Sequence, residues 1–370
     1  MKLRELLENI SPVLVDPKST SITVGISNRF FIFQLLKKLA EKIEDDPYLN
    51  FISILKSYKI LGKILNGTLH ELHRDRNKLY FKNFFIDRSL YSLVKRDLEW
   101  LYNRHQKHHG VKMTITKRGI IIYDNYQKNS FNVLLLTIHS GTWMRQDIQG
   151  KQFLTEKQRL LEEDIDTHRI YSSLVLEKGG IWIDNKASRF ECDYNRSPER
   201  AIYSNRSEKW IEEVWKEELS ESQKKWLMEG YNEFYFTLGR LIGTYRFNII
   251  FDGHSMKDAE GRPALSFGTR YIPKFYMPIV RSMQRKLQNM EYSPVALNQP
   301  YGGGYILQWL NSRFPDVFIC SMEVNKRLYM AKNRKRVIKK KLESLSKDIA
   351  LIFDIEDEPL PAPSPDSSAG

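Results

Sequence analysis

Residues 132–141 have the sequence NVLLLTIHSG, and residues 247–256 have the sequence FNIIFDGHSM. Each stretch begins with an almost continuous run of apolar residues, and such runs are typical of strands that are buried on both faces of a sheet. Both runs lead into a histidine that is followed by a serine, at His139 and at His254. The two stretches therefore predict inner strands of a sheet, with a histidine near the end of each.

Apolar runs and amphipathic segments alternate on both sides of these stretches. We expect strands at residues 111–117, 119–123, 132–138, 180–184, 246–252 and 316–324, and helices at residues 155–178, 220–241 and 275–290. Strands that alternate with helices are typical of an α/β sheet, in which ligands bind at the carboxyl ends of strands. The predicted fold class is α/β.

The chain is expected to contain more than this sheet. Apolar residues recur at three- and four-residue spacing over residues 30–64 and again over residues 80–102, which predicts amphipathic helices. A change of pattern follows at residues 110–130. We divide the chain into a mainly helical region at residues 1–110, an α/β domain at residues 111–332, a basic helix with a short apolar segment at residues 333–356, and a disordered tail at residues 357–370.

The composition limits the partners and the location of the protein. The 370 residues are enough for a sizeable core, and the net charge of +13 is compatible with anionic substrates or nucleic acid. Cys192 and Cys320 are too few for a disulfide framework. The N-terminus lacks the pattern of a signal peptide, and no apolar run approaches the ~20 residues of a membrane span. We therefore expect a cytoplasmic protein that does not span a membrane.

The two histidines at the strand ends predict a metal site. Neutral imidazole is a preferred zinc ligand, and a catalytic zinc ion takes three protein groups and keeps one position open. The third group is expected to be an acid. Asp164 is our candidate and Glu163 the alternative, and the choice among these two and Asp166 stays open, because all three lie in one acidic run within the predicted helix.

Two further carboxylates are placed to assist this site. Residues two apart on a strand point to the same face, so Asp252 can hold the outer ring nitrogen of His254. Glu323 lies at the end of another predicted buried strand, where a glutamate can take a proton from water and pass it to a leaving amine. The alternative role for Glu323 is a salt bridge with Lys326 or Arg327.

Other residue types indicate how a substrate is held. A guanidinium such as that of Arg196 can grip a carboxylate with two hydrogen bonds. The glycine-rich loop NQPYGGGY at residues 298–305 lets backbone amides approach a substrate closely. The expected substrate-binding residues are Asn195, Arg196, Asn298, Tyr301 and Gly303.

The sequence resembles the N-formylglutamate amidohydrolases, also called N-formylglutamate deformylases. The resemblance rests on six blocks in the family's order: HSG at 139–141, EDIDTHRI at 163–170, SRFECDYNRSPE at 188–199, DGHSM at 252–256, NQPYGGGY at 298–305 and MEVNKRLYM at 322–330. Single blocks of this kind are weak signals, but six in the right order are strong. The family is in turn similar to the carboxypeptidase A-like zinc hydrolases.

The resemblance implies a fold and an activity. The implied fold is a mixed central sheet flanked by helices, as in zinc carboxypeptidases, here with the helical N-terminal region added. One zinc ion would be held by His139 and His254, with Glu323 as general base and acid and Arg196 as the clamp for a carboxylate or oxyanion. The implied enzyme is a zinc-dependent amidohydrolase acting on linear amides, with an N-acyl amino acid, including an N-formyl one, or a short peptide bearing a carboxylate as substrate.

A second hypothesis comes from a different class of protein. The chain could be a non-catalytic, basic binding protein on a retained hydrolase scaffold, with nucleic acid or another anionic partner. Lys332 to Lys341 would then contact phosphates. Metal content and the salt dependence of binding separate this hypothesis from the enzyme.

Overall fold

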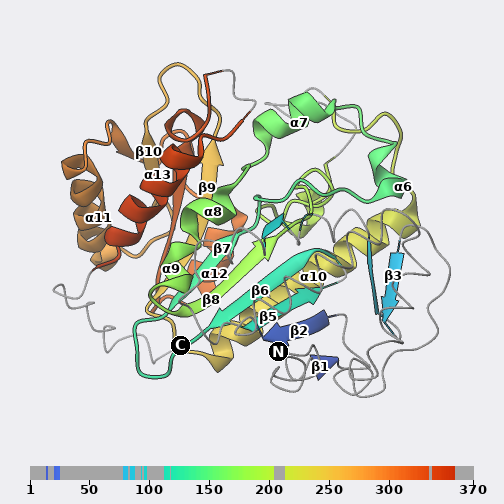
Figure 1. The fold of residues 1–370 in the computed structure, drawn as a ribbon, viewed down its shortest axis with the longest axis horizontal. Coiled ribbons are helices and arrows are strands. Elements are labelled where there is room, and N and C mark those ends of the chain that lie inside the picture. The colour runs from blue at the N-terminus through green and yellow to red at the C-terminus, as the bar shows by residue number, and fades with distance from the viewer. Residues whose placement is uncertain are drawn as a thin grey trace, which may run out of the picture. The chain divides into compact units, whose positions relative to one another are not determined.

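The computed structural model describes residues 14–15, 21–25, 78–81, 84–87, 93, 96–97, 112–116, 118–203, 213–332 and 336–354 (Figure 1). The chain divides into two compact units, Met1–Asn125 and Tyr126–Gly370. The candidate site lies in the second unit.

The described part of the first unit consists mainly of antiparallel strands. β1 (Leu14–Val15), β2 (Ser21–Gly25), β5 (Lys112–Thr116) and β6 (Ile120–Asn125) pair in this order, and β3 (Lys78–Phe81) pairs with β4 (Phe84–Asp87). The predicted strands at 111–117 and 119–123 are thereby confirmed. The predicted helix over residues 80–102 is wrong at residues 80–81 and 84–87, where clustered aromatic residues favour strands, although Leu93, Arg96 and Asp97 are helical. The predicted helices at 30–64 lie outside the described residues.

A mixed sheet forms the centre of the second unit. Its strand order is β8 (Gly180–Asn185), β7 (Val133–Thr137), β9 (Ile249–Met256), β12 (Phe318–Asn325), β10 (Leu265–Gly268) and β11 (Val295–Leu297). The first four strands are parallel, β10 is antiparallel to β12, and β11 is parallel to β10. The α/β class and the mixed sheet are confirmed, and the short strands β10 and β11 were not predicted.

Helices pack around this sheet. They are α6 (Gln146–Gln149), α7 (Glu156–Glu162), α8 (Thr167–Tyr171), α9 (Ser173–Leu176), α10 (Glu221–Thr244), α11 (Met277–Asn289), α12 (Tyr305–Arg313) and α13 (Lys339–Leu351), with short 3-10 turns at Pro198–Arg200, Lys274–Tyr276 and Lys326–Leu328. α10 and α11 confirm two predicted helices. α13 supplies the predicted basic helix but begins later than expected, and the predicted tail lies outside the described residues. None of the described helices combines the length and apolarity needed to cross a membrane.

The predicted helix at 155–178 is wrong as one continuous element. A capping box at Thr155 starts α7, but the chain turns extended at Glu163, with ψ 146°, and α8 begins only after Asp166. Asp166 has a φ of 61°, in the left-handed region that an aspartate tolerates better than most residues. The short loop between α7 and α8 carries Asp164, so this acid is held by a loop and not by a helix.

Packing between α8 and the sheet brings the site strands together. The Tyr171 ring of α8 lies 5.6 Å from that of Phe251, and its hydroxyl donates to the carbonyls of His254 and Met322 at 3.0 Å each. The backbone of β9 can come this close because residue 253 is glycine, where a Cβ would stand 2.3 Å from the Tyr171 ring. One buried tyrosine therefore links β9 to β12 beside the candidate site.

Candidate metal centre

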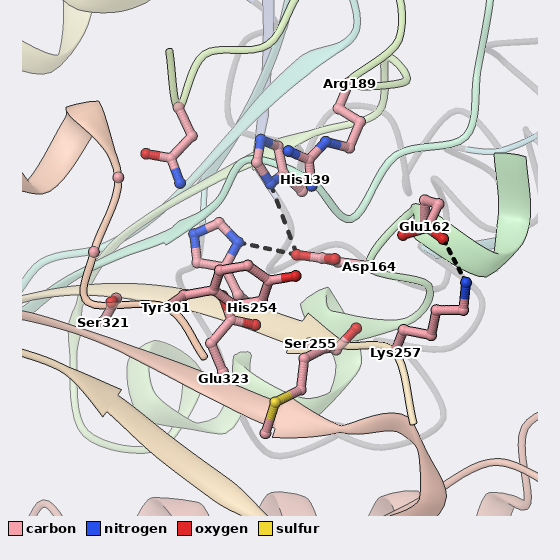
Figure 2. Close-up of a pocket in the computed structure, with 14 residues that line it drawn as sticks. His139, Glu162, Asp164, Arg189, His254, Ser255, Lys257, Tyr301, Ser321 and Glu323 are labelled. Carbon is pink, nitrogen blue, oxygen red and sulfur yellow. Dashed lines mark hydrogen bonds and ion pairs between the residues drawn. The ribbon is translucent and has the colours of Figure 1, made fainter. Parts of the chain in front are cut away.

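Three side chains from distant parts of the sequence converge on one point (Figure 2). His139 follows β7, His254 lies in β9, and Asp164 comes from the loop between α7 and α8. The Nδ1 atom of His254 lies 2.9 Å from Oδ2 of Asp164, and the Nδ1 atom of His139 lies 3.8 Å from the same oxygen. All three residues are buried, and one donor atom from each lies within 4.8 Å of the others. The two imidazole centroids are 4.9 Å apart.

Strand register explains why the histidines meet. β7 and β9 are parallel neighbours in which Leu136 pairs with Asp252, so the residues that follow in both strands emerge at the same edge of the sheet. His139 and His254 lie at this edge. The backbone N–H of Asp164 donates to the carbonyl of His139 at 3.2 Å, which brings the acidic loop to the same place.

Each imidazole has a second carboxylate on its far side. Nε2 of His139 lies 2.7 Å from Asp193, and Nε2 of His254 lies 2.7 Å from Asp252. A proton on each Nε2 would satisfy these carboxylates and leave both Nδ1 lone pairs directed at the point that Asp164 also faces. Histidines that bind metals in proteins are oriented in this way.

The electrostatics fit a cation between these three groups. Burial lowers the pKa of His254, but Asp252 and Asp164 outweigh it and hold this pKa well above its ordinary value. Burial and the nearby Arg189 lower the pKa of His139, which favours its neutral form. Burial raises the pKa of Asp164, but the two histidines bring it below its ordinary value. Ligand atoms of a tetrahedral zinc ion are about 3.4 Å apart, judging from its bond lengths, so the observed separations suit such an ion.

The cluster forms part of the wall of a pocket with a volume of about 230 Å³. Figure 2 shows His139, Asp164 and His254 beside the side chains of Glu323 and Arg189. Of the residues predicted to bind substrate, the pocket wall includes Asn195, Tyr301 and Gly303. At the rim, Lys257 pairs with Glu162 at 2.9 Å.

Glu323 lies next to His254, because the two residues pair in the parallel register of β12 and β9. Its Oε2 atom has no hydrogen-bond partner among the residues that the structure describes. Burial raises the pKa of Glu323 to about 7, against the effect of His254 and with a further rise from Asp164 and Asp252. A carboxyl group with this pKa can take up and release a proton near neutral pH.

Lys326 and Arg327, the residues considered as salt-bridge partners of Glu323, form hydrogen bonds with backbone carbonyls. The Lys326 ammonium donates to the carbonyls of Leu161 and Glu163, and Arg327 donates to the carbonyl of Arg262.

Glu163 and Asp166 do not join the cluster. Glu163 Oε1 accepts from Arg159 at 2.9 Å and from Ser188 at 2.5 Å. Asp166 Oδ1 lies 3.3 Å from the Arg169 guanidinium. Of the three acids considered in this run, the structure brings Asp164 to the histidines.

Two predicted substrate-binding residues, Arg196 and Asn298, are not among the residues that line the described pocket. The Arg196 guanidinium stacks on the Tyr203 ring at 4.1 Å. The side chain of Asn298 bonds to Thr269, accepting from its backbone N–H at 2.7 Å and donating to its hydroxyl at 2.8 Å.

Arg189 and Asp193 are functional candidates that the sequence prediction missed. Arg189 lines the pocket and donates to Asp193 at 2.8 Å, and Asp193 in turn holds His139. Both lie in the block SRFECDYNRSPE, so the available signal was the presence of two arginines and an aspartate in one short irregular segment.

Comparison with known proteins identifies the family of the chain. The sequence profile of the N-formylglutamate amidohydrolases matches residues 131–330. The chain belongs to this family. The match includes every residue of the cluster and Glu323. No curated protein matches the chain.

Two solved structures with TM-scores above 0.5 show the same fold. The N-formylglutamate amidohydrolase of Ralstonia eutropha is 18% identical, with a TM-score of 0.53 over 64% of this chain and 95% of that one. A gene product of Agrobacterium tumefaciens is 15% identical, with a TM-score of 0.51 over 64% of this chain and 93% of that one. A metallo-carboxypeptidase from Burkholderia cenocepacia is 8% identical, with a TM-score of 0.34 over 67% and 62% of the respective chains.

Proposed function

We propose that the chain is a zinc-dependent amidohydrolase of the cytoplasm. Its substrate is an N-acyl amino acid, including an N-formyl one, or a short peptide-like amide that bears a carboxylate. The observation that carries this proposal is the convergence of His139, Asp164 and His254 on the wall of a pocket that they share with Glu323. Membership of the amidohydrolase family supports it.

The ligand set favours zinc over harder cations. Two imidazole nitrogens and one carboxylate oxygen are donors that suit zinc, whereas magnesium and calcium prefer sites made of oxygens. Three protein ligands leave a coordination position open for reactants. A zinc ion held by His139, Asp164 and His254 would supply a Lewis acid that polarises the amide carbonyl and lowers the pKa of water.

Glu323 performs the proton transfers in this proposal. Its carboxylate takes a proton from water as the water oxygen bonds to the amide carbonyl carbon. It then gives that proton to the amide nitrogen as the carbon–nitrogen bond breaks, which releases a carboxylic acid and an amine. The raised pKa of Glu323 suits both steps, because the group must change protonation state twice in each turnover.

Arg189 replaces Arg196 in our assignment of the carboxylate clamp. Its guanidinium lies at the pocket wall and has five N–H donors, so it can hold Asp193 and still donate to a substrate carboxylate or oxyanion. Asn195, Gly303 and Tyr301 also line the pocket, and Tyr301 has 47% of its surface exposed. The small volume of the pocket suits an amino-acid-sized molecule.

The test combines metal analysis with a screen of N-acyl amino acids. The purified protein should hold one zinc ion and hydrolyse at least one of these substrates. Glu323→Gln should lower kcat by roughly 10²- to 10⁴-fold, the usual contribution of a general acid–base group, and should keep both the fold and the zinc ion. Glu191→Gln is the matched control, because Glu191 is also buried with a raised pKa but does not line the described pocket.

A scaffold that only binds would behave differently in the same experiment. It would show no turnover with any substrate, and Glu323→Gln would change nothing. Nucleic acid binding would instead appear as an affinity that falls steeply with salt. Absence of turnover, or a Glu323→Gln variant as active as the wild type, would contradict the proposal.

A further inference from the structure

Lys326 links the strand of Glu323 to the loop of Asp164. It follows β12 directly and is only 3% exposed. Its ammonium donates to the carbonyl of Leu161 and to the carbonyl of Glu163, at 2.6 Å each. These two carbonyls lie at the end of α7, immediately before Asp164.

The chemistry of a helix end explains why a lysine fits there. The last carbonyls of a helix have no partner within the helix, and they form the negative end of its dipole. An ammonium group has three donors and a positive charge, so one lysine can bind two such carbonyls at once. A buried charge is costly unless it is hydrogen-bonded. The Lys326 ammonium therefore needs acceptors at this position, and the two carbonyls supply them.

Further hydrogen bonds hold the rest of the loop between α7 and α8. The N–H of Asp164 donates to the His139 carbonyl at 3.2 Å, and its carbonyl accepts from the Thr167 hydroxyl at 2.8 Å. The Tyr329 hydroxyl donates to the carbonyl of Ile165 at 2.9 Å. Lys326 and Tyr329 both come from the segment after β12, so that segment holds the acidic loop on either side of Asp164.

We infer that Lys326 is a positioning residue for the metal centre. By holding the end of α7 it keeps the Asp164 carboxylate within reach of the two imidazole nitrogens, and it thereby sets the metal affinity of the cluster. Lys326 itself touches neither the metal nor the substrate. The inference rests on the proposed metal site, and it adds a residue that acts through Asp164.

The test measures zinc affinity in Lys326→Met, which keeps an unbranched apolar side chain up to the ε position and removes the ammonium. Losses of this kind around metal ligands weaken binding by roughly 10- to 100-fold, and we expect a change in this range by competition with a chromophoric chelator. The visible spectrum of the Co²⁺-substituted protein should also change. Arg327→Met is the matched control, because Arg327 donates to the Arg262 carbonyl at 3.1 Å and not to the acidic loop. It should keep the zinc affinity within about twofold.

A merely structural role for Lys326 gives a different result. Lys326→Met would then lower the melting temperature of the metal-free protein, while the zinc dissociation constant and the Co²⁺ spectrum stayed as in the wild type. This outcome would overturn the inference. If Lys326→Met does not fold, Tyr329→Phe removes one hydrogen bond to the same loop and should weaken zinc binding in the same direction by a few-fold. An unchanged affinity in that variant would also overturn it.

Failure of the proposed function is recognised separately. In that case the wild-type protein would not bind zinc, or His254→Ala would bind it as tightly as the wild type does. Neither result depends on Lys326.

Discussion

His139 and His254 each present one ring nitrogen toward Asp164 and the other to a carboxylate behind the ring. The rear carboxylates, Asp193 and Asp252, decide which ring nitrogen carries the proton. They also hold each ring in its orientation. In the proposed metal site, the affinity for the ion would therefore depend on residues that do not touch it.

Replacing one of these rear carboxylates tests that dependence. Asp252→Asn keeps the size of the side chain but loses the charge that fixes the proton on His254, so we expect zinc affinity to fall roughly 10- to 100-fold. Competition with a chelator measures the effect. Asp147→Asn, at an exposed carboxylate that pairs with Arg145, should leave the affinity unchanged. Equal affinities in the two variants would contradict the assigned role of Asp252.

Glu191 gives the fold a dependence on pH. Burial raises its pKa to about 8 from an ordinary value of 4.5, although the backbone N–H of Arg145 donates to it. Between these two pH values the unfolded chain releases the proton while the folded protein keeps it. Its contribution to the free energy of unfolding therefore falls as pH rises from 4.5 to about 8, by at most about 1.4 kcal/mol per pH unit.

Glu191→Gln should remove this slope, because glutamine does not ionise and can still accept from Arg145. Urea unfolding at pH 5, 6.5 and 8 measures it. We expect the variant to gain stability relative to the wild type as the pH rises. A constant difference between the two proteins at all three pH values would show that Glu191 ionises with an ordinary pKa.

At the scale of elements, the break between α7 and α8 decides which acid lies next to the two histidines. All residue types in this run are compatible with a helix, and their spacing alone predicted one helix over 155–178. Tertiary contacts end α7. Lys326 binds the carbonyls at its end, and the backbone N–H of Asp164 donates to the carbonyl of His139. These partners are distant in sequence, so a local pattern could not predict the break.

Substitutions at Asp166 test this loop. A β-branched residue in the left-handed region costs about 1–2 kcal/mol, so Asp166→Val should lower the free energy of unfolding by that amount. Asp166→Gly should not, because glycine adopts this φ freely. Both variants should bind zinc as the wild type does, since Asp166 lies outside the cluster. Loss of zinc binding in Asp166→Gly would instead make Asp166 the acidic ligand.

Sequence patterns predicted the structure best for strands in which nearly all consecutive residues are buried. The apolar runs of β7, β8, β9 and β12 predicted these four strands, and the histidine after the run identified two of the three cluster residues. The short strands β10 and β11 have too few residues for such a pattern. Arg189 and Asp193 lie in irregular backbone, where no periodicity indicates which side chain faces the pocket, so the sequence pattern did not distinguish Arg189 from the predicted Arg196.

At the scale of the whole molecule, the parallel arrangement of β7, β9 and β12 brings together residues that are far apart in the sequence. His139, His254 and Glu323 come from three neighbouring strands or their ends, and Tyr171 links two of these strands from α8. An ion at this point connects segments that would separate on unfolding. Metal binding should therefore stabilise the folded protein as a whole.

The expected size of this effect follows from linkage. A ligand that binds only the folded state adds about 2.7 kcal/mol to the free energy of unfolding when its free concentration is 100 times its Kd. Zinc should produce this gain in the wild type, and removing it with a chelator should reverse the gain. His254→Ala should show little response. Equal stabilisation of the variant would place the zinc elsewhere in the molecule.

The most direct test of the metal centre is anomalous diffraction at the zinc absorption edge from crystals of the zinc-loaded protein. We predict one strong peak within about 2.0–2.2 Å of Nδ1 of His139, Nδ1 of His254 and a carboxylate oxygen of Asp164. A fully loaded crystal with no peak at these atoms, or with its peak at another set of residues, would contradict the account.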